Sequence, residues 1–387
     1  MKTFQPIAGN KRIEIVDALR GFALLGVLLA NISYSTDTAV ASNSDSILTF
    51  LYHLLIDKKF ITIFSMLFGF GFYIQMTRAE QKGIKFKSYF LKRMVLLFII
   101  GLIHCFLIWN GDIIMSYAFG GAFLLMIRKW SLKRLLILAL IFNVFFTGAI
   151  FIGNSALGWA SYSYDFALWD QMSTTITYVE YLKINAIVAP WSNFMSDMPL
   201  TLCFTFGNML IGLILGKTKY FLSPSNLKRL VNWFIILGLT VGLLASYTYY
   251  QVISGKLELD IPQLWIPFAI VIGMLLQSMA YISLFLKLFR SNEGKKLLSW
   301  FKYVGKTALT NYIMQSVFYI TVIFHCTGLF KLYGTITMGE TLLLALVLFV
   351  LQSIMSYVWL NNFKQGPIEY IWRKLSYQSK QHRHEAN

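Results

Sequence analysis

Ten long apolar runs dominate this chain of 387 residues, and they restrict it to folds that a lipid bilayer can hold. A helix needs roughly 20 apolar residues to cross the hydrocarbon core, and each run reaches or approaches that length. The chain is also 57% hydrophobic, which is typical of integral membrane proteins. We therefore predict an all-α, polytopic membrane helix bundle of about ten transmembrane helices, at 13–33, 59–77, 93–110, 113–128, 132–153, 199–216, 229–251, 265–289, 304–326 and 340–360.

Basic residues predict how this bundle is oriented. Most of the 34 Lys and Arg residues lie in alternate connections, after the second, fourth, sixth, eighth and tenth runs. Connections rich in Lys and Arg stay in the cytoplasm, so we expect a cell-membrane protein with both termini in the cytoplasm. The net charge of +17 is spread over these connections instead of forming one patch, and we expect no nucleic-acid partner.

The domain organisation predicted from these runs is a single transmembrane bundle over 1–360, followed by a cytoplasmic interfacial helix and a basic tail at 361–387. Two external segments, 34–58 and 154–198, should carry amphipathic or interfacial helices. The second is rich in aromatic residues suited to the headgroup layer, and it is either a lid over an outward cavity or a surface connector. Its tryptophans are Trp159, Trp169 and Trp191.

Three polar residues interrupt the first run, VDALRGFALLGVLLAN. Arg20 and Asn31 are eleven residues apart, which brings them to nearly one face of a helix, and Asp17 lies one turn before Arg20. Polar groups are costly in hydrocarbon, so this stripe should face protein or a water-filled cavity. Two interpretations stay open: a functional stripe, or a buried Asp17–Arg20 pair with Asn31 capping the outer end.

Two histidines are candidate general bases. His104 is the only histidine deep inside a predicted span, past the midplane, and it either acts as a base or is hydrogen-bonded within the bundle. Asp112 follows a turn signal, Asn110-Gly111, and should cap the next span; its carboxylate can also orient the ring of His104. His53 lies on the external amphipathic stretch, on the same outer side of the membrane as Asn31. It is either a candidate base or simply a solvated histidine.

The ninth run opens with VGKTALTNYIMQS. Lys306 resembles the end of a phosphate-binding loop, but Trp300 stands where the first glycine of that motif is required, so the motif is absent. Thr307, Asn311 and Gln315 recur every four residues and form a polar ridge. Such a ridge either lines a cavity or joins two helices.

Five segments in order resemble the YeiB-like family of bacterial membrane proteins, whose C-terminal part is a domain of unknown function: RIEIVDALRGFALLGVLLAN, KKFITIFSMLFGFGF, GLIHCFLIWNGDIIMSYA, VGKTALTNYIMQS and GPIEYIWRKLSY. The first segment is also similar to the first membrane helix of heparan-α-glucosaminide N-acetyltransferase and related transmembrane acyltransferases. In that group, an Asn at the end of this helix and a His in the following external stretch serve acetyl transfer from cytosolic acetyl-CoA. Asn31 matches this Asn, whereas no histidine lies between Asn31 and Asp45, and His53 is the nearest.

The resemblance implies a membrane-bound O- or N-acyltransferase that moves an acyl group from a cytosolic acyl-CoA, with acetyl-CoA as the first expectation, to an extracytoplasmic sugar or lipid acceptor. The expected catalytic residues are His104 or His53 as base, Asn31 as oxyanion donor and Asp112 as orienting group. The expected donor-binding residues are Asp17, Arg20, Lys306, Thr307, Asn311 and Gln315. No metal is expected, membrane lipids are expected partners, and a homo-oligomer is an open alternative to a monomer.

A second function class fits the same residues. In a transporter or lipid-handling permease without covalent chemistry, the stripe of the first span and the ridge from Thr307 to Gln315 would line a substrate route. Dependence on a thioester donor separates the two classes, because only the acyltransferase releases a free thiol.

Overall fold

The computed structural model describes residues 13–33, 43–83, 85–149, 152, 171–175, 177–190, 198–221, 228–259, 263–324 and 329–377. Over these ranges the secondary structure is helical, without any β-strand, and the predicted all-α class is confirmed. The three tryptophans predicted to form an aromatic external segment, and the tail after Tyr377, lie outside the described residues. The predictions for them stay predictions.

The apolar runs form the long helices of the bundle. These are α1 (Glu14–Ile32), α3 (Lys59–Gln81), α4 (Phe86–Leu107), α5 (Ile114–Ile127), α6 (Leu132–Leu140) with its π-helical continuation η4 (Ile141–Phe146), α11 (Met198–Lys217), α12 (Lys228–Ile253), α13 (Ile266–Leu288), α16 (Ala308–Phe318) with its π-helical continuation η7 (Tyr319–Ile323), and α17 (Met338–Asn362). Further helices in the described ranges include α2 (Asn43–Leu55), α10 (Tyr178–Pro190), α14 (Asn292–Leu298), α15 (Phe301–Lys306) and α18 (Pro367–Tyr377).

Length and composition make this a membrane protein. Within the described ranges, seven helices are long and apolar enough to cross a bilayer, and Ile114–Ile127, Thr201–Lys217 and Ala308–Ile323 are shorter apolar helices. The outer face of α4 exposes a large apolar side chain at every fourth residue, which water would disfavour and lipid tolerates: Leu91, Val95, Ile99, Ile103 and Leu107. The predicted count of about ten spans and the predicted orientation stay predictions.

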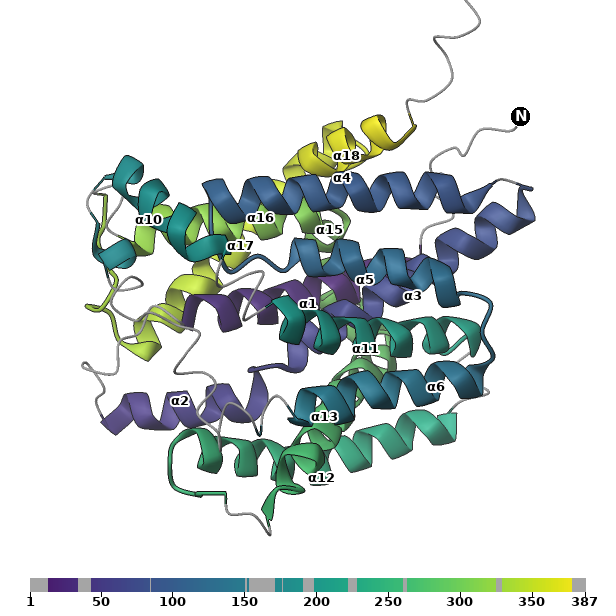
Figure 1. The fold of residues 1–387 in the computed structure, drawn as a ribbon, viewed down its shortest axis with the longest axis horizontal. Helices are drawn as coiled ribbons and strands as arrows, with labels where there is room; N and C mark the ends of the chain where they lie inside the picture. Colours follow the sequence, from purple (N-terminus) through teal and green to yellow (C-terminus); the bar gives the residue numbers. More distant parts are fainter. Residues whose placement is uncertain are drawn as a thin grey trace, which may run out of the picture.

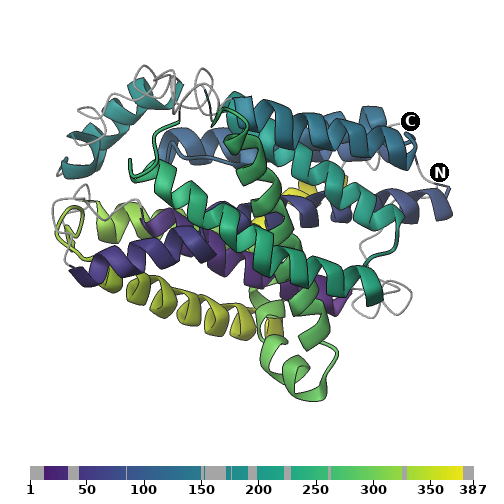
Figure 2. The same cartoon turned by 90° about the horizontal axis from the view of Figure 1, so that it is seen from below.

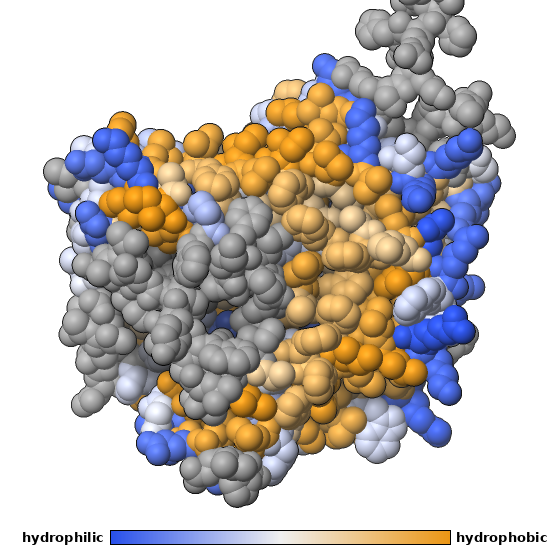
Figure 3. All heavy atoms as spheres, in the orientation of Figure 1, coloured by the Kyte–Doolittle hydropathy of each residue, from blue (hydrophilic) through white to orange (hydrophobic). Residues whose placement is uncertain are grey.

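Apolar and polar surfaces are separated along the long axis of the molecule. Figure 3 shows a broad apolar band, with hydrophilic residues concentrated at the right-hand end. The turns between α3 and α4 and between α5 and α6 lie at that end, while α2 and α10 lie at the other (Figure 1). We call the first the basic end, because these turns carry Lys82, Lys85, Arg128 and Lys129. The other is the opposite end.

Helix α1 is the central element of the bundle. It packs against α3, α13, α15, α16 and α17, and Figure 2 shows α17 running beside α1 and α2. Most of its apolar side chains are buried, among them Leu19, Leu24 and Leu28. The polar residues of α1 are therefore held inside the protein, where a polar group needs a partner or a solvated cavity.

Glycines allow the closest helix crossings. A Cβ at Gly305 of α15 would lie 1.8 Å from the Asp17 carbonyl oxygen, and one at Gly21 of α1 would lie 2.0 Å from the Phe301 carbonyl oxygen. A Cβ at Gly212 of α11 would lie 1.9 Å from the Met66 carbonyl oxygen. No side chain larger than hydrogen fits at these positions without moving a backbone.

Replacing Gly305 by alanine should therefore lower the free energy of unfolding by about 1–3 kcal/mol, because the added methyl group overpacks the crossing of α1 and α15. Gly71→Ala is the matched control. It lies in α3, no heavy atom is found within 4 Å of its Cβ position, and helix propensity alone should make it neutral or stabilising by up to about 1 kcal/mol. Thermal unfolding of both variants in one detergent measures the difference in their stability. Equal stability of the two variants would contradict the close packing of α1 against α15.

Candidate functional site

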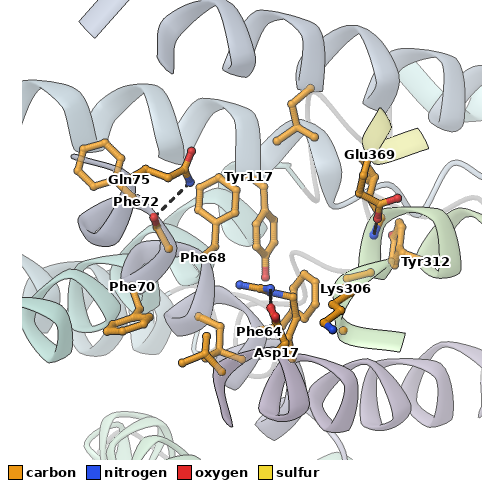
Figure 4. Close-up of a pocket in the computed structure, with 18 of the residues that line it drawn as sticks. Asp17, Phe64, Phe68, Phe70, Phe72, Gln75, Tyr117, Lys306, Tyr312 and Glu369 are labelled. Carbon is orange, nitrogen blue, oxygen red and sulfur yellow. Dashed lines mark hydrogen bonds and ion pairs between the residues drawn. The ribbon is translucent and has the colours of Figure 1, made fainter. Parts of the chain in front are cut away.

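A cavity of about 350 Å³ lies inside the bundle, and we call it the central cavity. Its walls come from α1, α3, α4, α5, the junction of α15 and α16, and α18. Residues far apart in the sequence meet there, since Asp17, Tyr117, Lys306 and Glu369 surround one space in Figure 4. The sequence-predicted residues that line it are Asp17, Arg20 and Lys306.

The central cavity is elongated along the helices that line it. On α1 the lining residues extend from Ile13 to Val27, about 21 Å at 1.5 Å per residue. On α3 the lining face repeats at alternating intervals of three and four residues over about 26 Å, from near the opposite end to the basic end. Its residues include Ile61, Phe64, Phe68, Gly71, Gln75 and Arg78.

The part of the central cavity nearest the basic end is strongly cationic. Five lining side chains are basic, against the two carboxylates Asp17 and Glu369: Arg20, Arg78, Arg93, Lys306 and Arg373. Arg20, Arg78 and Arg93 lie within about two turns of their helix ends on this side. In a partly desolvated site such an excess of positive charge attracts an anion far more strongly than it would in water.

Asp17 and Arg20 form the pair that the sequence predicts. The Arg20 Nη1 donates to the Asp17 Oδ1 at 3.0 Å, and Asp17 is 8% exposed. The geometry fixes one side of the guanidinium, and the other side keeps its fork of N–H donors, which suits the oxygens of a phosphate or carboxylate. This pair stands on the wall of the central cavity.

Arg93 is held by three elements. Its Nη1 donates to the Gln75 Oε1 at 2.9 Å and to the Tyr89 hydroxyl at 3.0 Å, and its guanidinium lies 4.0 Å from the ring centroid of Trp372. The indole Nε1 of Trp372 donates to the Arg93 carbonyl oxygen at 2.9 Å. These contacts join α4 to α3 and α18 and hold a cation at the edge of the cavity.

Away from the basic end, the walls of the central cavity are apolar and aromatic. Phe64 and Phe68 of α3 face Tyr117 of α5, with ring centroids at 5.9 Å and 5.2 Å. The Tyr117 hydroxyl is hydrogen-bonded to the Ser65 Oγ at 2.6 Å, and Figure 4 shows it directed toward the region of Asp17. This wall suits an uncharged chain better than a second anionic group.

His104 and Asp112 form a buried pair beside this wall. The His104 Nδ1 is hydrogen-bonded to the Asp112 Oδ2 at 2.7 Å, and the Asp112 Oδ1 accepts the Met115 N–H at 2.8 Å. One carboxylate thus caps α5 and orients an imidazole, as the sequence suggests. His104 is 1% exposed, and within the described residues its buried Nε2 has no hydrogen-bond partner. Its ring lies 5.4 Å from that of Tyr312, which lines the central cavity.

His53 belongs to a second pair at the opposite end. Its Nδ1 is 3.2 Å from the Asp57 Oδ2, which also accepts the Tyr249 hydroxyl at 3.2 Å. The preceding residue, Tyr52, donates to the Ala30 carbonyl oxygen at 3.4 Å and so brings this pair to the end of α1 that carries Asn31. The His53 side chain is 20% exposed, in contrast to the sealed His104.

Asn31 lies just beyond the central cavity. Val27 is the last α1 residue of the wall, and Asn31 follows it by four residues on the same face, about 6 Å further along the axis. The cavity therefore leads from the cationic residues toward Asn31 without reaching it.

Comparisons with known proteins place this architecture in a family. Residues 215–379 match a family described as a protein of unknown function (DUF418). The chain is 30% identical to the "Uncharacterized 39.9 kDa protein in amylase 3'region" of Bacillus acidopullulyticus, covering 97% of this chain and 96% of that protein. It is 29% identical to YxaH of Bacillus subtilis over 98% of both chains. It is 28% identical to YeiB of Escherichia coli over 95% of this chain and 96% of YeiB. The chain belongs to the YeiB-like family.

In this YeiB-like protein the ridge on α16 faces another helix. The side-chain amide of Asn311 donates to the Ser356 Oγ at 2.9 Å, and that of Gln315 donates to the Gln352 Oε1 at 3.0 Å. The Thr307 hydroxyl also contacts Ser356, at 3.1 Å. The structure therefore places Thr307, Asn311 and Gln315 against α17 and outside the wall of the central cavity, whereas the adjacent Lys306 is part of that wall.

Several residues of this YeiB-like site carry no clear sequence signal. In the sequence, Arg78 and Arg93 resemble charges of a cytoplasmic connection. Glu369 and Trp372 resemble parts of a surface helix. Asp57 has a recognisable signal, because it follows His53 by four residues and continues its helical face.

Burial raises the pKa of the Glu369 carboxyl, although hydrogen bonds from Thr310 and Leu309 oppose this effect.

Proposed function

We propose that this YeiB-like protein is a transmembrane acyltransferase, which transfers an acyl group from a cytosolic acyl-CoA to an acceptor on the other side of the membrane. One observation carries the proposal. The central cavity joins a cluster of five cations to an aromatic passage that ends one helical turn before Asn31. A thioester donor with phosphates at one end and an uncharged arm has the matching order of groups.

The dimensions support this assignment. An extended pantetheine arm has about 13 bonds between phosphate and sulfur, and therefore spans about 16 Å at the bond lengths of a polypeptide backbone. The wall of α3 extends for about 26 Å and that of α1 for about 21 Å. Phosphates held by Arg20, Arg93 and Lys306 would thus leave the thioester near the inner limit of the cavity, toward Asn31.

Orientation is part of the same proposal. The basic end carries the connections rich in Lys and Arg, and the positive-inside tendency assigns this end to the cytoplasm of a cell membrane. The cations of the central cavity then face the compartment that holds acyl-CoA. Asn31 and His53 lie toward the compartment of the acceptor, a cell-envelope sugar or lipid.

The transfer step assigns one role to each group. The His104 Nε2 takes the proton of the acceptor hydroxyl or amine after Tyr312 rotates aside, while Asp112 holds the imidazole by its Nδ1. The acceptor oxygen or nitrogen bonds to the thioester carbonyl carbon, and the Asn31 amide donates to the oxyanion that forms. The C–S bond then breaks, and the leaving thiolate takes the proton back from His104.

Binding of acetyl-CoA to the purified protein in detergent tests the donor site. Arg20→Gln removes the cation but keeps a donor for Asp17, and it should weaken binding by about 10- to 100-fold, the effect of losing hydrogen bonds to a charged group. Gly71→Leu should also weaken binding, because its side chain would extend into the central cavity from a position with no atom within 4 Å. Isothermal titration calorimetry measures both effects.

Two matched controls accompany this experiment. Gly71→Ala adds only a methyl group in the same open space, and Lys295→Gln removes a cation from an exposed position at the basic end. Lys295→Gln should bind acetyl-CoA within about twofold of the unchanged protein, since a screened surface charge contributes little. Gly71→Ala should weaken binding less than Gly71→Leu, because a methyl group fills less of the central cavity. Absence of binding by the folded, unchanged protein, for acetyl-CoA and for longer acyl-CoAs, would refute the proposed donor site.

A second candidate function has one observation in its favour. His104 is 1% exposed and does not line the central cavity in this conformation, so the cavity also fits a permease for an anionic lipid or metabolite. Such a permease would move its substrate without consuming a thioester. Protein-dependent release of free thiol from acetyl-CoA is expected only from the acyltransferase.

A further inference from the structure

The C-terminal helix α18 forms a wall of the central cavity. It packs against α4 and α16, and three of its side chains, Glu369, Trp372 and Arg373, line the cavity near the basic end. It is therefore more than a surface helix, because it takes part in the cationic cluster.

Glu369 fastens this helix to the interior of the bundle. Its Oε1 accepts the Leu309 N–H at 2.7 Å and the Thr310 N–H at 3.1 Å, and its Oε2 accepts the Thr310 hydroxyl at 2.5 Å. These N–H groups belong to the first turn of α16, where backbone N–H groups have no acceptor within their own helix. A carboxylate on one helix thus caps another helix about 60 residues earlier in the chain.

The capped turn stands directly beside Lys306. Lys306 is the last residue of α15, and the chain leaves helical geometry at Thr307, with φ −116° and ψ 33°, before α16 begins. The direction of the Lys306 side chain therefore depends on how this break is held. Figure 4 shows Glu369, Tyr312 and Lys306 on the same side of the cavity.

We infer that Glu369 is a positioning residue of the donor site, which holds α18 against the break between α15 and α16 and so fixes Lys306, Arg373 and Trp372 around the phosphates of the donor. The inference rests on the proposed function. Trp372 transmits the same restraint to α4, because it contacts the guanidinium of Arg93 and donates to its carbonyl oxygen. Without Glu369 the cations remain, but their arrangement is no longer set.

The test compares two helix-capping glutamates. Glu340 also accepts a backbone N–H at a helix start, with the Thr337 N–H donating to its Oε2 at 2.8 Å, but it belongs to α17 itself and does not line the central cavity. Glu369→Ala should weaken binding of acetyl-CoA by about 10-fold or more, whereas Glu340→Ala should change it by less than about twofold. Glu369→Gln keeps an oxygen acceptor and should restore most of the affinity.

A capping role alone would affect the stability of both variants and the affinity of neither. Equal donor affinities for Glu369→Ala and Glu340→Ala would therefore overturn the inference while leaving the proposed function in place. If Glu369→Ala does not fold, Trp372→Phe removes the hydrogen bond to Arg93 without touching the cap, and an unchanged affinity in that variant would likewise overturn the inference. Failure of the unchanged protein to bind any CoA thioester would overturn the proposed function itself.

Discussion

Replacing His104 by asparagine should lower the rate of acyl transfer by about 10²- to 10⁴-fold, the contribution of a well-placed general base. Asparagine is chosen because its amide can still donate to the buried Asp112 carboxylate, which His104→Ala would leave unpaired. An unpaired buried charge is costly, and the alanine variant would confuse loss of folding with loss of chemistry. The measurement is the initial rate of thiol release from acetyl-CoA in membranes that contain equal amounts of folded protein.

Two comparisons make this result specific. The affinity for acetyl-CoA should be unchanged, because His104 does not line the central cavity. His53→Asn removes the imidazole from the equivalent pair at the opposite end, and we expect it to have the smaller effect. A larger loss of rate in His53→Asn than in His104→Asn would transfer the role of base to the pair formed by His53 and Asp57.

Replacing Asn31 by alanine should lower the rate by about 10²- to 10³-fold, as expected when a donor to a developing oxyanion is removed. The donor affinity should hardly change, since Asn31 lies one turn beyond the cavity wall. Stability should also hold, because Asn31 is in the last turn of α1 and alanine is the better helix former.

The readout for Asn31 is a separation of the maximal rate from the affinity. A rate lowered at saturating acetyl-CoA, with an unchanged dissociation constant, is the expected pattern for a group that acts only in the transition state. A loss of affinity without a loss of maximal rate would instead make Asn31 part of the donor site. An unchanged maximal rate would remove it from the mechanism.

The sequence predicts the architecture well because a bilayer leaves few choices. A run of apolar residues between basic connections has to become a helix that satisfies its own backbone, and the described helices follow those runs. The stripe of Asp17 and Arg20 is visible for the same reason, since helical geometry alone places both residues on one face.

The sequence does not predict which neighbouring helix or cavity each helix face meets. The ridge of Thr307, Asn311 and Gln315 is visible as a periodic pattern, but periodicity does not tell whether a neighbouring helix or a cavity faces it. Here α17 supplies Ser356 and Gln352 as partners. Arg93 resembles a charge of a cytoplasmic connection because it follows Lys85, Lys87 and Lys92, and only the packing of α4 against α18 turns it toward the cavity.

The helix that carries Glu369 combines a feature that the sequence predicts with one that it does not. Pro367 at the start of a helix is readable from sequence, because proline fits the first helical position. The sequence does not predict that the Glu369 carboxylate caps α16, since the pairing depends on where a separate helix begins in space. Asp112 is the intermediate case, because its cap to Met115 is local whereas its bond to His104 needs the crossing of α4 and α5.

Thiol release from acetyl-CoA added to inverted membrane vesicles, which expose the cytoplasmic face, is the decisive test of acyl transfer across the membrane. Vesicles from cells that produce the protein also contain the envelope sugars and lipids proposed as acceptors, and vesicles with the His104→Asn protein provide the background. We expect protein-dependent release of free CoA, coupled one for one to acetyl groups retained in the vesicles, and loss of both in the variant. Thiol release no faster than in the variant vesicles, from protein shown to be folded and to bind acetyl-CoA, would contradict this expectation.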